Sequence, residues 1–121
     1  MQGDQLFDSK GREQAVWKIC IDKDKIYRGV ELIFPTQHLD VSKIIQRFSQ
    51  NENVKKIIIF GSSVTSACNP WSDIDVFVEL KREDTLRKPK VGVPIDLWTN
   101  YDVDDRLMQE ISEKGVVVYE R

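Results

Sequence analysis

The run at residues 56–60 limits the possible folds more than any other segment of the chain. It reads Lys-Ile-Ile-Ile-Phe, and Gly61 ends it. An apolar run of this length, without alternation between polar and apolar residues, predicts a strand that is buried on both faces. Residues 62–70 are mostly small and polar, which predicts a turn with a short helix. The segment therefore indicates a strand inside a sheet, followed at once by a tight turn.

Periodic patterns in the rest of the chain predict the other elements. Apolar side chains at helical spacing follow Asp40 and Asp102, each of which can cap a helix. A charged connector at 81–90 separates two strand-like segments. The predicted helices cover 41–51 and 103–114, and the predicted strands cover 73–80, 92–98 and 116–119. This order predicts an α/β (α+β) fold in which helices pack on one face of a small mixed sheet.

The N-terminal part of the chain has a different pattern. Within 15–34, two apolar-rich runs flank the charged residues 22–25, which predicts a β-hairpin, with a short helix as the alternative. Residues 1–13 are polar and contain glycine, so we expect a frayed end there. We therefore divide the chain into a tail and hairpin extension at 1–36 and one domain at 37–121.

The composition excludes several kinds of site. With one histidine, His38, and two cysteines, Cys20 and Cys68, the sequence offers no Cys/His metal cluster and no disulfide framework. The net charge of −2 gives no general attraction to nucleic acid or to an acidic membrane. No apolar run reaches the length of a membrane span, and the polar start lacks a signal-peptide core. We expect a cytoplasmic protein whose chemistry depends on carboxylates, hydroxyls and the metals that they recruit.

Three aspartates fall on the predicted strands. Asp73 and Asp75 are two residues apart, so their side chains point to the same face of a strand. Two such carboxylates repel each other, and a cation between them reverses that cost. Asp96 lies between Ile95 and Leu97 on the next strand and points away from their apolar face. If the two strands are neighbours, the three carboxylates converge, and hard oxygen ligands of this kind favour two Mg²⁺ ions.

Gly61 and Ser62 suit the binding of phosphate. A strand that turns into a short helix exposes unpaired backbone N–H groups, and glycine lets a phosphate approach them closely. The hydroxyl of Ser62 can donate to the same oxygen atoms. Taken alone, the glycine and serine form a plain turn and the aspartates are solvated strand residues. Their combination favours a phosphate site next to a metal site.

These residues resemble a known signature. Gly61-Ser62, ten further residues and then Asp73-x-Asp75 resemble the polymerase-beta-like nucleotidyltransferase superfamily, and look most like its minimal nucleotidyltransferases (MNT). The other residues that match this pattern in type and order are Phe60, Pro70, Ser72, Ile74 and Asp96. The resemblance covers about residues 40–121 and implies the nucleotidyltransferase fold.

The resemblance also implies an activity and a set of roles. The enzyme would move a nucleoside monophosphate, AMP from ATP, onto a hydroxyl group. Asp73 and Asp75 would bind two Mg²⁺ ions, with Mn²⁺ as the alternative, and Asp96 would complete the second metal site and help deprotonate the acceptor. The residues implied to bind the nucleotide are Gly61, Ser62 and Ser63.

The acceptor and the partner are open at this stage. The resemblance implies either a hydroxyl of a partner protein, as in an antitoxin paired with a helical HEPN-type toxin, or a small molecule, as in aminoglycoside nucleotidyltransferases. A homodimer would then build the small-molecule pocket. The alternative function is a non-catalytic module that neutralises its partner by contact. It is motivated by Ser63, Thr65 and Ser66, which stand where many family members carry arginines and a further glycine.

Four other residues have plainer interpretations. We expect Trp71 and Trp98 to pack against the protein rather than stack on a nucleobase. His38 is expected at the surface or its boundary. Cys68 lies in the predicted site loop, but no base stands near it in sequence to activate its thiol.

Overall fold

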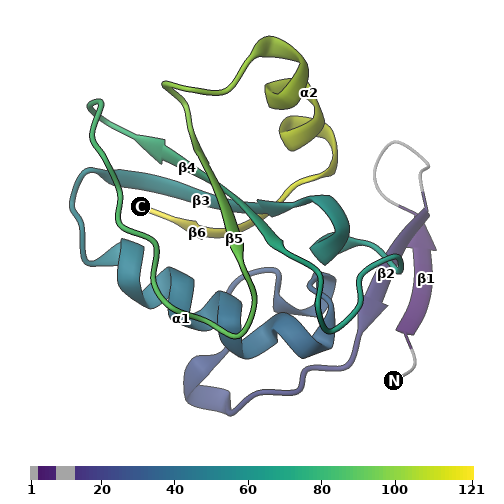
Figure 1. Cartoon of the computed structure of the whole chain (residues 1–121). Coiled ribbons are helices and arrows are strands. Elements are labelled where there is room, and N and C mark those ends of the chain that lie inside the picture. The colour runs from purple at the N-terminus through teal and green to yellow at the C-terminus, as the bar shows by residue number, and fades with distance from the viewer. Residues whose placement is uncertain (1–2, 8–12) are drawn as a thin grey trace.

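The computed structural model describes residues 3–7 and 13–121, with the side chains described from Val16 onward. Its strands form two sheets (Figure 1). The smaller is an antiparallel hairpin, and the larger has the strand order β5-β4-β3-β6. The hairpin strands are β1 (Gly3–Phe7) and β2 (Glu13–Trp17), and the others are β3 (Val54–Phe60), β4 (Ile74–Leu80), β5 (Ile95–Thr99) and β6 (Val116–Glu120).

The larger sheet is mixed. β3 is antiparallel to both of its neighbours, β4 and β6, whereas β5 is parallel to β4. β3 occupies an inner position, as its uninterrupted apolar run predicts. The mixed α+β class predicted from the sequence is confirmed.

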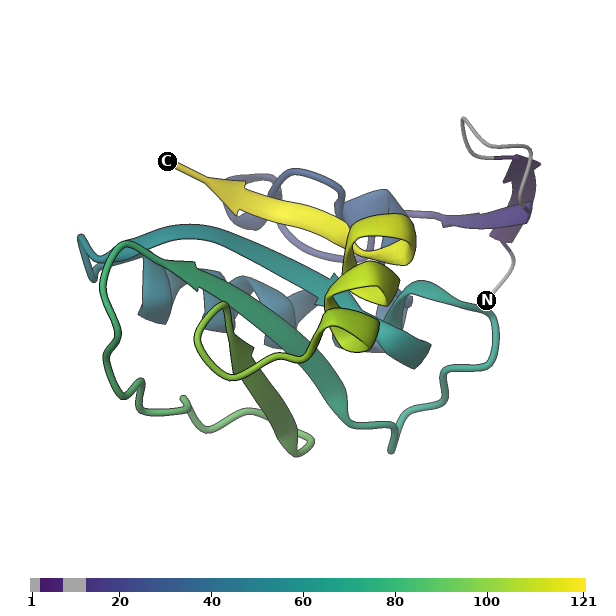
Figure 2. The same cartoon turned by 90° about the horizontal axis from the view of Figure 1, so that it is seen from above.

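The helices α1 (His38–Ser49) and α2 (Asp105–Lys114) cover opposite faces of this sheet, so the prediction that helices pack on one face is wrong. Ile57 belongs to the same buried cluster as Ile44 of α1, while its neighbour Ile58 belongs to the cluster that contains Ile111 of α2. Figure 2 shows α2 in front of the strands and α1 behind them. The physical reason is that β3 is apolar on both faces, and each face needs its own cover.

The N-terminal hairpin exists, but at other residues than predicted. It pairs Gly3 with Trp17 and Phe7 with Glu13, so the hairpin predicted over 15–34 is wrong in its position. The frayed end predicted for 1–13 is also wrong where it overlaps β1; residues 1–2 and 8–12 lie outside the described residues. Residues 18–37, which we call the strap, contain short 3₁₀ turns at Lys23–Lys25, Val30–Leu32 and Pro35–Gln37. Gly29 has a φ of 78°, which ends any extended run before Val30.

His38 joins the strap to α1 and is fully buried, so its predicted place at the surface or its boundary is wrong. The backbone N–H of Cys20 donates to Nδ1 of His38 at 3.2 Å. Nε2 therefore carries the ring proton and donates to the carbonyl of Ile33 at 2.7 Å. Burial lowers the pKa of His38, so the ring is held neutral.

The caps of both helices also differ from the prediction. The Asp104 carboxylate accepts from the backbone N–H of Leu107 at 2.7 Å and caps α2, whereas the Asp102 carboxylate accepts from the N–H of Thr99. α1 begins at His38, so Asp40 lies in its first turn instead of before it. No helix in the described part of the chain has the length and the apolar surface needed to cross a membrane.

Candidate active site

Asp75 and Asp96 lie side by side where β4 and β5 begin. The two strands are parallel, and Asp75 pairs with Asp96 in register, so both side chains stand on the same face of the sheet. On its other side Asp75 pairs with Phe60, the last residue of β3. Asp75 shares its face with Phe77, which packs in the cluster under α2. The carboxylates therefore lie on the face that α2 covers.

Asp73 lies just before β4 and is exposed to solvent. The backbone N–H of the next residue, Ile74, donates to the carbonyl of Pro94 at 3.0 Å, which ties the start of β4 to β5. The negative charge of Asp73 acts on Asp75. Among the described residues, however, no three His, Cys, Asp or Glu side chains are arranged to hold a metal ion between them. The structure thus brings Asp75 and Asp96 together and places Asp73 at the edge of the pair.

The surroundings of Asp75 disfavour its charge. Burial is the main effect that raises its pKa to about 6, followed by the charge of Asp96 and a hydrogen bond with it, and then by the charges of Asp73 and Glu110. All of the charged neighbours that shift this pKa are acidic. Uncompensated carboxylate oxygens in this arrangement have the chemistry that a hard divalent cation such as Mg²⁺ requires.

The Gly61 turn packs directly against the Asp75 carboxylate. Gly61 begins a short 3₁₀ turn, Gly61–Val64, and has a φ of 72°. Residues other than glycine rarely adopt this backbone conformation. A Cβ atom at this position would also collide with Oδ2 of Asp75. Only glycine fits here, so a ligand at the turn would also lie near the carboxylates.

The two serines after Gly61 differ in exposure. Ser62 is half-buried, whereas Ser63 is fully buried, and its hydroxyl has no hydrogen-bond partner in the described part of the protein. The carbonyl of Ser63 accepts from the backbone N–H of Phe34 in the strap at 2.8 Å. Ser62 therefore keeps part of its surface accessible to a nucleotide, whereas the Ser63 side chain does not.

The loop before Asp73 is held by its own hydrogen bonds. The N–H of Asn69 donates to Oγ of Ser72 at 3.0 Å, and the N–H of Ser72 donates to the carbonyl of Asn69 at 3.1 Å. At its tip Trp71 is 82% exposed, so the prediction that it packs is wrong; Trp98 is 37% exposed. Cys68 is buried, and burial raises the pKa of its thiol, in agreement with the expected lack of reactivity.

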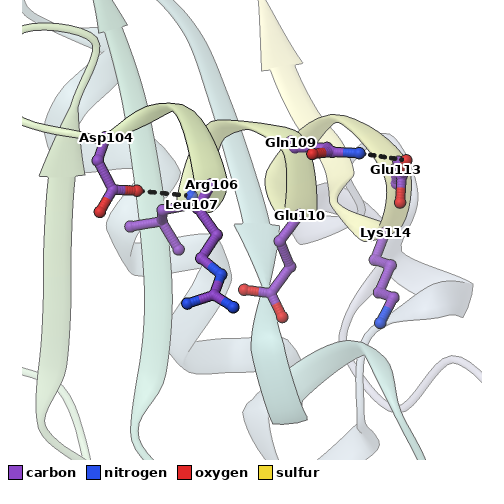
Figure 3. Close-up of a pocket in the computed structure, with 7 residues that line it drawn as sticks. All are labelled: Asp104, Arg106, Leu107, Gln109, Glu110, Glu113 and Lys114. Carbon is purple, nitrogen blue, oxygen red and sulfur yellow. Dashed lines mark hydrogen bonds between the residues drawn. The ribbon is translucent and has the colours of Figure 1, made fainter.

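Sequence reasoning missed the contribution of α2 to the site. The side chains of Arg106, Glu110 and Lys114 point to the same side of the helix (Figure 3). They line a cavity of about 510 Å³, and the charge of Glu110 reaches Asp75. The apolar run of β3 was the available signal, because a strand buried on both faces needs a helix on the face where Asp75 stands.

The mixed sheet, the paired aspartates and the glycine turn define a nucleotidyltransferase fold. The chain belongs to the nucleotidyltransferase domain family, which its residues 41–118 match. Gly61, Asp73, Asp75 and Asp96 all lie inside the matched range. This membership supports nucleotidyl transfer as the general activity. A comparison with curated proteins found no match.

Proposed function

We propose that the chain is a metal-dependent nucleotidyltransferase that moves AMP from ATP onto an acceptor hydroxyl. The observation that carries the proposal is the register of Asp75 and Asp96 on adjacent parallel strands, against the turn at Gly61. A pair of carboxylates that is destabilised by burial and by further acidic neighbours, beside backbone that only glycine fits, is costly for a purely structural region.

The proposed metal ligands are Asp73, Asp75 and Asp96. Asp73 and Asp75 would contact both of two Mg²⁺ ions, and Asp96 would complete the second site; Mn²⁺ is the alternative ion. When bound, the ions supply charge neutralisation on the phosphate oxygens of the nucleotide and on the acceptor oxygen. The acidic surroundings of Asp75 support this assignment, because a cation reverses the repulsion that raises its pKa.

The remaining residues would position the nucleotide and move a proton. The backbone at Gly61 and the Ser62 hydroxyl would bind the phosphates, and Ser63 would contribute through its backbone alone. The acceptor oxygen forms a bond to the α-phosphorus as the bond from that phosphorus to the β-phosphate oxygen breaks, and pyrophosphate leaves. Asp96, which is exposed, would accept the acceptor's proton.

We further propose that the chain is of the minimal nucleotidyltransferase type and that its acceptor is a hydroxyl of a HEPN-type partner protein. Asp73 and Asp96 are both exposed, so a side chain on the surface of another protein has access to them. A small-molecule acceptor would need walls around these carboxylates, which a second copy of the chain would have to supply.

The test combines the purified chain with labelled ATP, Mg²⁺ and the proposed HEPN-type partner protein. We expect label on the partner with the native chain and none with Asp75→Ala or Asp96→Ala. Glu79→Gln, on the same face of β4 but at its far end, serves as the matched control and keeps the activity. Neutralisation of the partner that survives both aspartate changes would instead establish a module that acts by contact.

A further inference from the structure

Gln37, the last residue of the strap, is bonded to the loop that carries Asp73. Its side chain is 1% exposed, and its Nε2 donates to the backbone carbonyl of Ser72 at 2.9 Å. Residue 37 lies outside the range that matches the nucleotidyltransferase domain family. A side chain outside the matched range thus holds the residue next to a proposed metal ligand.

Asp73 is fixed through its two neighbours in the chain. On one side the Ser72 carbonyl accepts from Gln37, and on the other the Ile74 N–H donates to the Pro94 carbonyl at 3.0 Å. The Asp73 side chain itself is exposed. Since solvent does not fix an exposed carboxylate, the position of Asp73 depends on these two backbone anchors.

The strap also holds the Gly61 turn. The N–H of Phe34 donates to the carbonyl of Ser63 at 2.8 Å, and the N–H of Gln37 donates to the carbonyl of Phe34 at 2.9 Å. One short segment of the strap therefore bonds both the proposed phosphate turn and the Asp73 loop. This sets the separation between the two parts of the site.

Gln37 is a destabilising residue at a buried position. Its Oε1 atom has no hydrogen-bond partner among the described residues. An unpaired buried oxygen destabilises the folded state, and an apolar side chain of the same length would avoid that cost. The amide is therefore better explained by what its N–H group holds than by packing.

We infer that Gln37 is a positioning residue that holds Asp73 in place for the divalent cation, and that the strap is a working part of the active site. The inference rests on the proposed function. Gln37 acts through the Ser72 carbonyl and the backbone of Asp73, without contact to the cation or the nucleotide.

The experiment compares Gln37→Met, which keeps the length of the side chain but removes the donor, with Asn100→Ala as the matched control. The amide of Asn100 donates to the carbonyl of Leu80 at 3.1 Å, so it makes the same kind of bond at the opposite end of β4. Mn²⁺ affinity is measured by electron paramagnetic resonance without ATP, and kcat and KM for ATP are measured with Mg²⁺. Circular dichroism verifies that each variant is folded.

We expect Gln37→Met to lose about 10-fold to 100-fold in Mn²⁺ affinity and in kcat, with KM for ATP little changed. Asn100→Ala should have the Mn²⁺ affinity, the kcat and the KM for ATP of the native chain. If Gln37→Met does not fold, Gln37→Asn, whose amide is too short to reach Ser72, is expected to show the same losses. Native Mn²⁺ affinity in the Gln37 variants, or equal losses in Asn100→Ala, would refute the inference alone. A native chain that neither binds Mn²⁺ nor transfers label would refute the proposed function as well.

Discussion

At Asp75, burial and acidic neighbours act in the same direction and raise the pKa to about 6, from an ordinary value of 3.8. As the pH rises, this carboxyl ionises in the unfolded chain before it ionises in the folded protein. The free energy of unfolding therefore falls as the pH rises between these two values. The contribution to stability is therefore unfavourable above about pH 6 and disappears as the pH falls toward the ordinary pKa. A proposed metal ligand is therefore a residue that weakens the fold at neutral pH, a pattern common at active sites.

Asp75→Asn is accordingly expected to stabilise the metal-free protein at about pH 7 while abolishing transfer. The change removes the charge, and the expected gain is about 1–2 kcal/mol once solvent screening is allowed for. Urea unfolding in the presence of a chelator measures it. The gain should shrink as the pH is lowered toward about 4. A loss of stability at neutral pH would show that the carboxylate is better accommodated than its acidic neighbours indicate.

Gly61→Ala tests the contact between the turn and Asp75. An alanine there would adopt a strained positive φ and would press its Cβ atom against the Asp75 carboxylate. We expect a loss of at least about 1 kcal/mol in the free energy of unfolding, together with loss of activity. Gly92→Ala, at an exposed position with no positive φ, is the control. Its Cβ atom would lie 3.1 Å from Oδ2 of Asp40, the end of a side chain that can shift, so stability should change less than in Gly61→Ala. A Gly61→Ala variant with the free energy of unfolding of the native chain would show that the turn can shift without cost.

Among the elements, β3 requires a helix on each of its faces. Ile44 of α1 and Ile111 of α2 are both buried but belong to different clusters, so Ile44→Ala and Ile111→Ala should each cost about 2–5 kcal/mol. Ile26→Ala, at a side chain 46% exposed, should cost less than about 0.5 kcal/mol. Thermal or urea unfolding gives all three values. If Ile111→Ala behaves like Ile26→Ala, α2 does not cover the face on which Asp75 stands.

The strap should make the protein sensitive to acid through His38. Burial lowers the pKa of this ring below its usual 6.5, so the unfolded state takes up a proton first as the pH falls. Its stabilising effect is complete above about pH 6.5 and is lost progressively below that value. We expect His38→Gln to be less stable than the native chain at about pH 7.5 but to lose less stability on going to about pH 5.5. If the free energy of unfolding changes equally with pH in the two proteins, His38 is excluded as the titrating group.

For the whole molecule, the sequence was sufficient to predict the mixed sheet and the face on which Asp75 and Asp96 stand. The apolar run before Gly61 identified an inner strand, and the alternation around Asp75 and Asp96 identified their faces. The register that pairs these two aspartates was not predictable, because the charged connector after β4 does not fix how the next strand aligns. The strap was misread because it runs through short 3₁₀ turns, whose spacing resembles neither a strand nor a helix. Gln37 carries no sequence signal, since its role depends on a carbonyl 35 residues away.

The most direct test of this account is the fate of the α-phosphate of ATP. The native chain is incubated with the proposed partner protein and Mg²⁺ in two parallel reactions, one with ATP labelled at the α-phosphate and one with ATP labelled at the γ-phosphate. We expect the α-label to become covalently attached to the partner, the γ-label to leave as pyrophosphate, and Asp75→Asn to transfer neither. Attachment of the γ-label, or attachment of the α-label by Asp75→Asn, would contradict this account.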